Sequence, residues 1–330
     1  MTTYKEINGT NIEAVSSDPA NPVVGQVWYN TTTNVVKGQV FQTAGWSTGG
    51  SLNTARYVLA AAGTQTAGLA FGGEVPTLVA VTESYNGSAW TEVNDLNTGR
   101  QELAGSGTQT SAVAFGGRTP PITGASESWN GTSWTATPSL NTARRYLGGA
   151  GADNTSSLAF GGPNAAPGGT NQALTESWNG SAWTEVADLN SARGNLAGTG
   201  VQTSALAIAG DMPPASPIDV AITESWNGSS WTEVGDLNTG KQSLASAGTV
   251  NTSALAFGGS SPGVSNTATT EEWNGTSWTE VNDLNTARRQ LTGTGSSSTA
   301  LAIGGKVTVS TASTEAWTGA GPATVTFTDS

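Results

Sequence analysis

The sequence predicts an all-β fold, a β-propeller of six four-stranded blades with a short N-terminal β-hairpin arm. Three observations support this prediction. The stretch ESWNGTSWTATPSLNTAR at residues 127–144 recurs in near copies at 83–100, 176–193, 224–241 and 271–288. The copies follow one another at intervals of 44 to 49 residues, a period typical of propeller blades. The chain is rich in Gly, Ser, Thr and Asn yet contains twelve tryptophans, which indicates short strands and tight turns rather than disorder.

Three landmarks define the repeat, and each occurs six times. They are the leucine of LNTAR, the second glycine of FGG (IAG or IGG in two copies) and the glutamate of ESWNG. The leucines are Leu52, Leu96, Leu140, Leu189, Leu237 and Leu284. The glycines are Gly73, Gly117, Gly162, Gly210, Gly259 and Gly305. Six copies of each landmark predict six blades.

Each repeat contains four strand patterns. In the second copy the stretch RQELAGSG is the first strand and Ser111–Gly117 is the second; the third ends at Trp129 and the fourth begins at Trp134. The pair Asn130–Gly131 accepts positive φ at both positions and therefore favours a tight hairpin between strands three and four. We expect the two tryptophans to lie close across this hairpin and to cover the neighbouring blade.

The repeat resembles the kelch-type β-propeller. That family is marked by a Gly-Gly pair after the second strand, an aromatic residue in the third, a Trp at the start of the fourth, and an Arg near the first. Here these marks are Gly116–Gly117, Trp129, Trp134 and Arg144. The resemblance runs from Leu52 to the C-terminus and implies the fold, but it says little about function. The last copy departs from the pattern, because no second tryptophan follows Trp317.

A propeller must be closed where its first and last blades meet. Trp46 stands six residues before the first repeat leucine, which is the offset of the fourth-strand tryptophan in the second copy. The segment around Trp46 therefore predicts a fourth strand for the last blade, beside residues 314–317. The C-terminal stretch ATVTFT at 323–328 competes for the same place. We favour the Trp46 strand.

The predicted domains are residues 1–45, an arm with a β-hairpin at 25–41, and residues 46–330, the propeller. The chain also resembles structural proteins of marine bacteriophages, on its repeats and on three short motifs. The motifs are Tyr4–Ile7, Gly25–Asn30 and Lys37–Gly38. The resemblance implies a virion protein whose arm, including Tyr4, Trp28 and Tyr29, attaches to the particle while the repeats face outward.

Composition excludes several functions. The chain has neither cysteine nor histidine, so it lacks the ligands of common zinc, copper and haem sites, the thiol nucleophile and the histidine base of a hydrolase triad. The copper-dependent alcohol oxidation of some kelch relatives is excluded for the same reason. A net charge of −12 argues against a nucleic-acid partner. We expect no catalytic residues, no metal, no cofactor and no enzymatic activity.

Targeting signals are also missing from the sequence. Its N-terminus has no basic and apolar secretory pattern, and no apolar run is long enough to span a membrane. We therefore expect a protein that is made in the host cytoplasm without a signal peptide, does not insert into membranes, and resides on the virion as a tail or capsid appendage.

The repetition lapses between the Gly-Gly pair and the glutamate, where 9, 9, 13, 13, 11 and 9 residues intervene. This segment joins strands two and three, so the variable loops gather on one face of a rigid scaffold, where binding usually resides. The two longest loops predict a raised contact patch on adjacent blades. Its residues are Pro163, Asn164, Asn171, Gln172, Asp211, Met212, Pro213, Ile218 and Asp219. Tolerated drift of solvent-exposed loops is the alternative.

One basic residue and one glutamate also recur in every blade. The bases are Arg56, Arg100, Arg144, Arg193, Lys241 and Arg288, and the acids are Glu83, Glu127, Glu176, Glu224, Glu271 and Glu315. The bases could form a ring that grips an anion, or each could pair with a glutamate or backbone carbonyl at a blade junction. We favour the second interpretation, because a feature present in every blade usually serves the scaffold.

Together these observations predict a non-enzymatic virion surface protein, a tail fibre, appendage or decoration module. Its loop face would bind a host-surface glycan or protein, or a neighbouring virion protein, and residues 1–45 would bind other virion proteins. Two alternatives remain: a purely structural spacer of tail or capsid, and a cellular kelch-like scaffold for protein partners.

Overall fold

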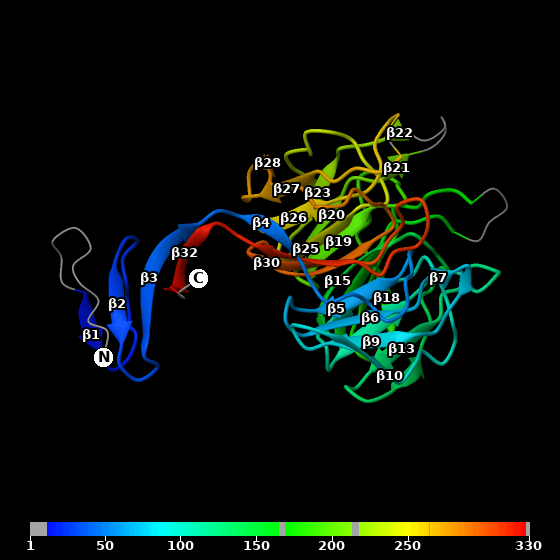
Figure 1. The fold of residues 1–330 in the computed structure, drawn as a ribbon. Coiled ribbons are helices and arrows are strands. Elements are labelled where there is room, and N and C mark those ends of the chain that lie inside the picture. Colours follow the sequence, from blue (N-terminus) through cyan, green and yellow to red (C-terminus); the bar gives the residue numbers. More distant parts are fainter. Residues whose placement is uncertain (1–11, 165–168, 213–217, 264, 328–330) are drawn as a thin grey trace. The chain divides into compact units, whose positions relative to one another are not determined.

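The computed structural model describes residues 12–164, 169–212, 218–263 and 265–327, which contain strands and no helix. These residues form seven four-stranded sheets and two two-stranded ribbons (Figure 1). The predicted all-β propeller class is confirmed. The repeat predicted six four-stranded sheets, and the seventh is built from segments outside the repeat.

The chain divides into two compact units. Unit 1 is residues 1–44 with 319–330, and unit 2 is residues 45–318. The sequence assigned everything from residue 46 onward to the propeller, so the C-terminal segment was placed in the wrong unit. Each unit is therefore described by itself.

Unit 2 contains six four-stranded antiparallel sheets. The first three are β5 (Ala60–Gly63), β6 (Gly68–Phe71), β9 (Thr82–Tyr85) and β10 (Trp90–Val93); β11 (Ala104–Gly107), β12 (Ala112–Phe115), β13 (Ser126–Trp129) and β14 (Trp134–Thr137); and β15 (Gly148–Asp153), β16 (Ser156–Phe160), β17 (Thr175–Trp178) and β18 (Trp183–Val186). The next two are β19 (Ala197–Val201), β20 (Ser204–Ile208), β23 (Thr223–Trp226) and β24 (Trp231–Glu233); and β25 (Ala245–Val250), β26 (Ser253–Phe257), β27 (Thr270–Trp273) and β28 (Trp278–Val281). The sixth is β29 (Thr292–Gly295), β30 (Thr299–Ile303), β31 (Thr314–Thr318) and β4 (Gly45–Thr48). We call these sheets blades 1 to 6.

The first strands of the blades line the centre of unit 2, and each contacts the first strand of the next blade. Strand β29 of blade 6 contacts β5 of blade 1, which closes the ring. Blade 6 takes its fourth strand from the other end of the chain, because β4 pairs with β31 and places Trp46 opposite Trp317. The prediction that the Trp46 strand closes the ring is confirmed.

Unit 1 holds the seventh sheet, in the order β1 (Glu13–Val15), β2 (Val27–Asn30), β3 (Val35–Gln42) and β32 (Gly321–Phe327). The predicted hairpin corresponds to the antiparallel pair β2 and β3. The C-terminal stretch, which competed for the propeller closure, instead pairs with β3 over seven residues. Strand β3 extends through eight residues and pairs with β2 on one edge only over Val35–Gly38, so its other edge accepts the long C-terminal strand, a partner that the hairpin pattern alone did not reveal.

Aromatic side chains seal the seams between blades. Trp129 and Trp134 face each other across the Asn-Gly hairpin with ring centroids 5.3 Å apart. Trp134 also contacts Phe71 of the preceding blade edge-on at 4.9 Å, and its Nε1 donates to Thr82 Oγ1 of that blade. Such aromatic pairs contribute roughly 0.5–1.5 kcal/mol beyond area burial. The repeated tryptophans therefore hold one blade to the next.

At a second contact across the seam, the size of a side chain on one blade correlates with the size of its partner on the next blade. In four blades the second strand ends in Phe, and the first strand of the next blade has a glycine two residues after its buried leucine. A Cβ placed on these glycines would lie 2.3 Å from Phe71 at Gly105, 2.9 Å from Phe115 at Gly149, 2.6 Å from Phe160 at Gly198 and 2.6 Å from Phe257 at Gly293. Where Phe is replaced by Ile208 or Ile303, the following blade has Ser246 or Ala61 instead of glycine. Ring size on one blade is thus complemented by side-chain volume on the next.

The recurring bases and glutamates form buried ion pairs. The pairs are Arg56–Glu83, Arg100–Glu127, Arg144–Glu176, Arg193–Glu224, Lys241–Glu271 and Arg288–Glu315. All six bases are at most 1% exposed, so they cannot grip an anion from solvent. Desolvation lowers the pKa of Arg100, and the Glu127 carboxylate opposes that shift. The interpretation of these residues as scaffold is confirmed.

Candidate binding site on the loop face

The loops that vary in length lie against the links between blades. In each blade, β-bridge pairing joins a residue of the link before the first strand to a residue that follows the Gly-Gly pair. The bridged pairs are Tyr57–Glu74, Gln101–Arg118, Arg144–Asn164, Gly194–Asp211, Gln242–Ser260 and Arg289–Lys306. The links and the variable loops therefore share one face of unit 2, which we call the loop face. Ribbons β7 (Glu74–Val75) with β8 (Thr77–Leu78), and β21 (Asp211–Met212) with β22 (Ile218–Asp219), belong to it (Figure 1).

The two long loops of blades 3 and 4 contact each other. Asn171 Nδ2 donates to the Asp211 carbonyl at 2.8 Å, and Asn195 Nδ2 donates to Asp211 Oδ1 at 2.8 Å. Gln172 folds back and donates to the carbonyl of Thr170. The structure thus brings Asn171 and Asp211 together, but it uses both in bonds between blades.

Other predicted contact residues have different surroundings. Pro163 is buried, and its carbonyl accepts from the Arg145 amide, so it is not available as a contact residue. Asn164 is half-buried and bridges to Arg144, and Met212 is half-buried opposite Ile218 in the ribbon. Pro213, like Tyr4 of the arm, lies outside the described residues.

Asp219 is the predicted residue that reaches the centre of the loop face. It lies opposite Asp211 in the ribbon, and its Oδ1 has no hydrogen-bond partner among the described residues. Burial, reinforced by the Asp211 carboxylate, raises the pKa of Asp219, while a hydrogen bond from Gln242 acts in the opposite direction. The carboxyl therefore faces a polar region without full compensation.

Six residues at the mouth of the central channel form a site that the loop lengths did not reveal. We call them the neck residues: Val58, Glu102, Tyr146, Asn195, Ser243 and Gln290. Each donates its backbone N–H to the carbonyl of the neck residue in the preceding blade, and Val58 donates to Gln290, at 2.8–3.0 Å. The six hydrogen bonds form a closed ring around the channel.

All six neck residues have left-handed backbone conformations, with φ between 48° and 61°. Non-glycine residues rarely adopt such values, and a β-branched residue such as Val58 is an outlier there. The chain has 44 glycines and places many of them at other positive φ positions, yet none is in the neck. Residues whose backbone is held in such a strained conformation cluster at functional sites.

The neck residues also differ from one blade to the next. The link reads Arg-Tyr-Val-Leu, Arg-Gln-Glu-Leu, Arg-Arg-Tyr-Leu, Arg-Gly-Asn-Leu, Lys-Gln-Ser-Leu and Arg-Arg-Gln-Leu in the six copies. The flanking base and leucine hardly change, whereas the two residues between them change every time. A position-by-position comparison of the repeats carries this signal; a comparison of loop lengths does not.

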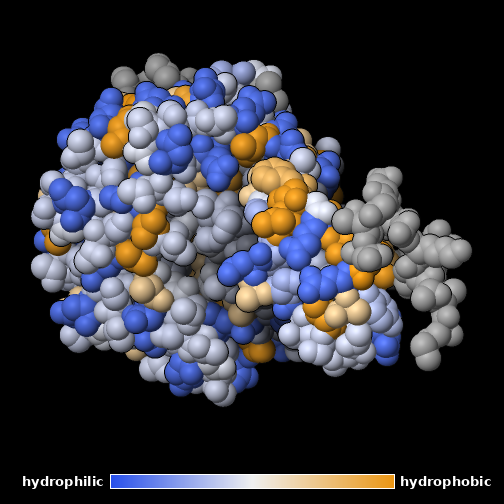
Figure 2. Space-filling view, turned by 90° about the vertical axis from the view of Figure 1, so that its left-hand side faces the viewer, coloured by the Kyte–Doolittle hydropathy of each residue, from blue (hydrophilic) through white to orange (hydrophobic). Residues whose placement is uncertain are grey.

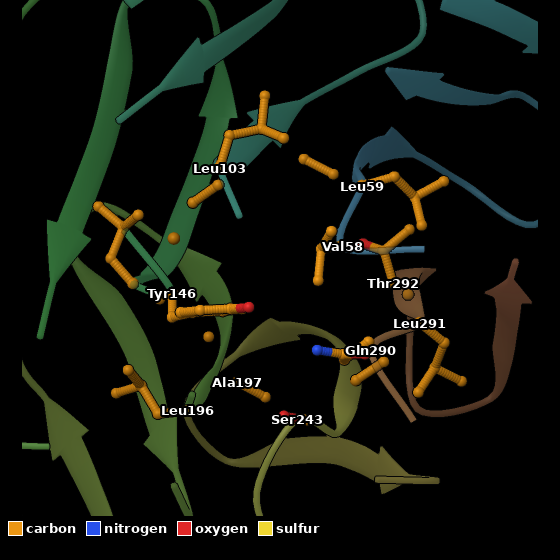
Figure 3. A pocket seen from close by; sticks show the side chains of 18 of the residues that line it. Val58, Leu59, Leu103, Tyr146, Leu196, Ala197, Ser243, Gln290, Leu291 and Thr292 are labelled. Atoms are coloured by element: carbon orange, nitrogen blue, oxygen red, sulfur yellow. The ribbon is translucent and has the colours of Figure 1, made fainter. Parts of the chain in front are cut away.

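The neck side chains line a cavity of about 130 Å³ at the end of the channel (Figure 3). Tyr146 and Gln290 point toward each other across the opening in Figure 3. Glu102 is 6% exposed and accepts from Arg145 Nη1 at 2.8 Å. Burial and the Glu102 carboxylate raise the pKa of Tyr146 above its ordinary value, so the phenol stays protonated. The opening is therefore narrow and lined by hydrogen-bonding groups.

A wider groove of about 800 Å³ adjoins the channel mouth, and we call it the mouth groove. It is lined by Tyr146, Asn195, Asp219, Gln242, Ser243, Ser260, Ser261, Pro262, Gly263, Ser265, Arg289 and Gln290. Its volume falls within the range of small-molecule sites, about 300–1,000 Å³. Its lining differs from most such sites, because hydroxyl and amide groups outnumber apolar ones.

Charge is distributed unevenly over unit 2. Outside the six buried pairs, the bases of residues 45–318 are Arg118, Arg145, Arg289 and Lys306. All four belong to the loop face through the bridges and hydrogen bonds of the links. Arg145 pairs with Glu102, whereas the other three have no ion pair with a described carboxylate. Solvent-facing positive charge in this acidic unit is therefore confined to the loop face.

The described residues contain no group of three or more Asp or Glu side chains that could hold a metal ion. Within the same part of the chain, no helix has the length and apolar character needed to cross a membrane. In the view of Figure 2, apolar residues are scattered in small separate groups among polar ones. These observations leave the loop face as the candidate site of unit 2.

The arm residues of unit 1 have unequal exposure. Trp28 is fully buried, and its Nε1 donates to Asp18 Oδ1 at 3.0 Å, so it supports the sheet and is not available for attachment. Tyr29 is half-buried on the same strand. Among its described residues, unit 1 exposes the large apolar side chains of Val23, Val24, Phe41 and Phe327.

Comparisons with known proteins bear on the fold. No protein-family model matches the chain, and no curated protein matches it significantly. Among solved structures, that of YjhT is similar, with a TM-score of 0.67 and 12% sequence identity. The match covers 80% of this chain and 95% of YjhT. At this identity the likeness concerns the fold alone.

Proposed function

We propose that the chain is a non-enzymatic binding module whose contact surface is the loop face, centred on the channel mouth. We further propose that it is a surface component of a phage particle, a tail appendage or decoration module that attaches through unit 1. The first part is carried by the neck residues, and the second by the resemblance of the arm motifs and repeats to phage structural proteins.

The observation that carries the binding proposal is a set of strained, varied side chains in an otherwise uniform ring. A non-glycine residue in the left-handed region costs about 1–2 kcal/mol. If the neck served only the fold, glycine would relieve this strain, as it does at the Gly-Gly pairs with φ near 65° and 100°. Six different side chains at the neck positions support a contact surface that recognises a ligand.

Attachment through unit 1 is supported by its surface. Among the described residues, six large hydrophobic side chains are exposed, and four of them belong to unit 1. Exposed large apolar side chains can contact another protein, and unit 1 holds most of those that the described residues expose. They would bind another virion protein, as the arm motifs imply.

Glycine substitution in the neck tests the binding proposal. The full-length variants Gln290→Gly and Ser243→Gly should fold with unchanged or higher thermal midpoints, because glycine tolerates positive φ. Fluorescently labelled variants should bind the host cells at least tenfold more weakly than the parent chain. The matched control Ser229→Gly, in an exposed hairpin turn on another part of blade 4, should bind like the parent. Loss of stability with intact cell binding would show that the neck serves the fold.

The attachment proposal separates the virion protein from its two alternatives. Phe41→Ser with Phe327→Ser in the full-length chain should reduce its incorporation into particles, measured by mass spectrometry of purified virions, while cell binding of the free chain persists. A structural spacer predicts incorporation without cell binding by the parent chain. Absence of the chain from the particles would favour a cellular scaffold and overturn the virion assignment.

A further inference from the structure

We infer that the mouth groove binds a neutral saccharide, held by Asp219, Gln242 and Arg289 at the rim of the channel. The inference rests on the proposed binding function and names its ligand class. Its basis is the chemistry of the groove lining, the unsatisfied carboxylate inside it and the size of the space.

The lining is rich in groups that exchange hydrogen bonds and poor in apolar surface. It includes the amides of Asn195, Gln242 and Gln290, four serines, one tyrosine and one proline. Amides and hydroxyls both donate and accept, so they match a ligand that carries many hydroxyl groups. An apolar ligand would leave these polar groups without partners on binding, which costs about 1–3 kcal/mol for each group.

The charges of the groove favour a neutral ligand. Asp219 and Arg289 each contribute one opposite charge to the lining, and no second base lines it. A phosphate or carboxylate ligand would meet the Asp219 carboxylate in a protein of net charge −12. A cation would meet Arg289. A sugar hydroxyl group can instead donate a hydrogen bond to Asp219 and accept one from Arg289.

Both charged groups have bonding capacity left. Asp219 Oδ1 is buried and has no hydrogen-bond partner among the described residues, and Gln242 bonds the same carboxylate. Arg289 Nη1 donates to the Ser265 carbonyl at 2.7 Å and to Asn266 Oδ1, which fixes the guanidinium. Its Nε and Nη2 have no hydrogen-bond partner among the described residues. A guanidinium held by loop oxygens and a carboxylate that is not fully bonded therefore line the same groove, where both can bond hydroxyl groups of one sugar.

The dimensions place the ligand at the rim and not in the channel. The groove offers about 800 Å³, whereas the cavity inside the neck offers about 130 Å³. Four neck residues line both spaces and so form the floor on which the ligand rests: Tyr146, Asn195, Ser243 and Gln290. Contact with the ligand explains why the neck has polar side chains on a strained backbone, where glycine would remove the strain.

The test uses the full-length protein on an array of immobilised neutral mono- to tetrasaccharides, followed by titration of each retained sugar in solution. At least one sugar should be retained, and Asp219→Asn and Gln242→Ala should each weaken its binding about tenfold or more. The matched control Glu272→Gln changes another partly buried acid outside the groove and should leave binding unchanged. Tripolyphosphate and triglycine, tested in parallel, should not compete. Retention of no sugar, equal binding by the groove variants, or competition by triglycine or tripolyphosphate would overturn the inference.

The same experiment separates sources of the sugar and separates the two proposals. A retained sugar that binds equally well immobilised and free identifies the end of a surface glycan as a sufficient ligand, and a retained sugar that binds at least tenfold more tightly in solution identifies a free sugar. If Gln290→Gly abolishes cell binding while no sugar binds, the saccharide inference fails and the binding module stands. If cell binding is unaffected by the neck variants, the proposed function fails regardless of the sugars.

Discussion

The packing of Phe71 against Gly105 makes a quantitative prediction about how the blades recognise their neighbours. In Gly105→Ala, the new Cβ would lie 2.3 Å from Phe71 Cζ and 2.8 Å from Cε2. Carbon atoms in contact normally stand about 3.5–4.0 Å apart, so the ring must move by more than 1 Å. Gly105 has ordinary extended φ, and the clash is therefore purely one of volume. Overpacking of this kind destabilises a core by about 1–3 kcal/mol.

The same contact predicts its own rescue. Phe71→Ile alone should cost about 1–2 kcal/mol, because it leaves a gap beside Gly105 and removes the edge contact with Trp134. In the double variant the added methyl group fills part of that gap, reproducing the Ile303–Ala61 combination already present between blades 6 and 1. The double variant should be more stable than the sum of the single changes by about 1–2 kcal/mol, within the range of couplings measured for contacting residues.

Blades 4 and 5 provide the reverse cycle. Ile208→Phe should clash with the side chain of Ser246, and Ser246→Gly should restore room for the ring. Both cycles are measured by urea unfolding of the full-length chain, followed by tryptophan fluorescence with constant m values. If the effects of Gly105→Ala and Phe71→Ile simply add, the reasoning that matches ring size to side-chain volume across the seam is refuted.

Three further predictions concern the scaffold. Arg144→Met leaves the Glu176 carboxylate buried without its partner, and should therefore lower the free energy of unfolding by about 3–5 kcal/mol. Urea titrations measure this loss, and a loss below about 1 kcal/mol would show that the ion pair is dispensable. Ser297→Gln should supply the side-chain amide with which each of the five other blades bonds the third-strand carbonyl of its neighbour, as Gln109 bonds Tyr85. It should raise the thermal midpoint through a bond of about 0.5–1.5 kcal/mol; Gln109→Ser is the reverse control. Hydrogen bonds from Lys37, Asn30 and Trp28 lower the pKa of Asp18 to about 2, so the stability that this carboxylate gives unit 1 is present above about pH 4 and lost as the pH falls toward 2. The protection factors of the β2 amides against hydrogen exchange should therefore fall over that window in the parent chain and stay constant in Asp18→Asn, and an equal fall in both would exclude Asp18 as the cause.

The sequence by itself determined the repeat and what the repeat builds. Local rules sufficed for the seam tryptophans and for the bases and glutamates that pair in the core. Asn-Gly does mark the hairpin, but the turn contains four residues, positive φ occurs at Gly131 and not at Asn130, and the Asn130 side chain accepts from the amides of Thr132 and Ser133. The strand at Trp46 was also readable, because its spacing to the next leucine matches that of the other fourth strands. The sequence also contains the correlation of Phe with Gly and of Ile with Ser or Ala between successive repeats. Only the structure shows that these positions are in contact across a blade boundary.

Tertiary structure alone decided the rest. The pairing of β32 with β3 joins residues nearly three hundred positions apart, and no local pattern distinguishes this partner from an open edge in blade 6. The loops of variable length do share one face, as predicted, but their length selected residues such as Pro163 and Asn171 that are used in packing or in bonds between loops. The neck and the mouth groove exist only because ring closure brings one residue from each of six distant links around a common axis. A site assembled by symmetry from single residues has no contiguous motif, and its chemistry becomes visible when the ring is closed.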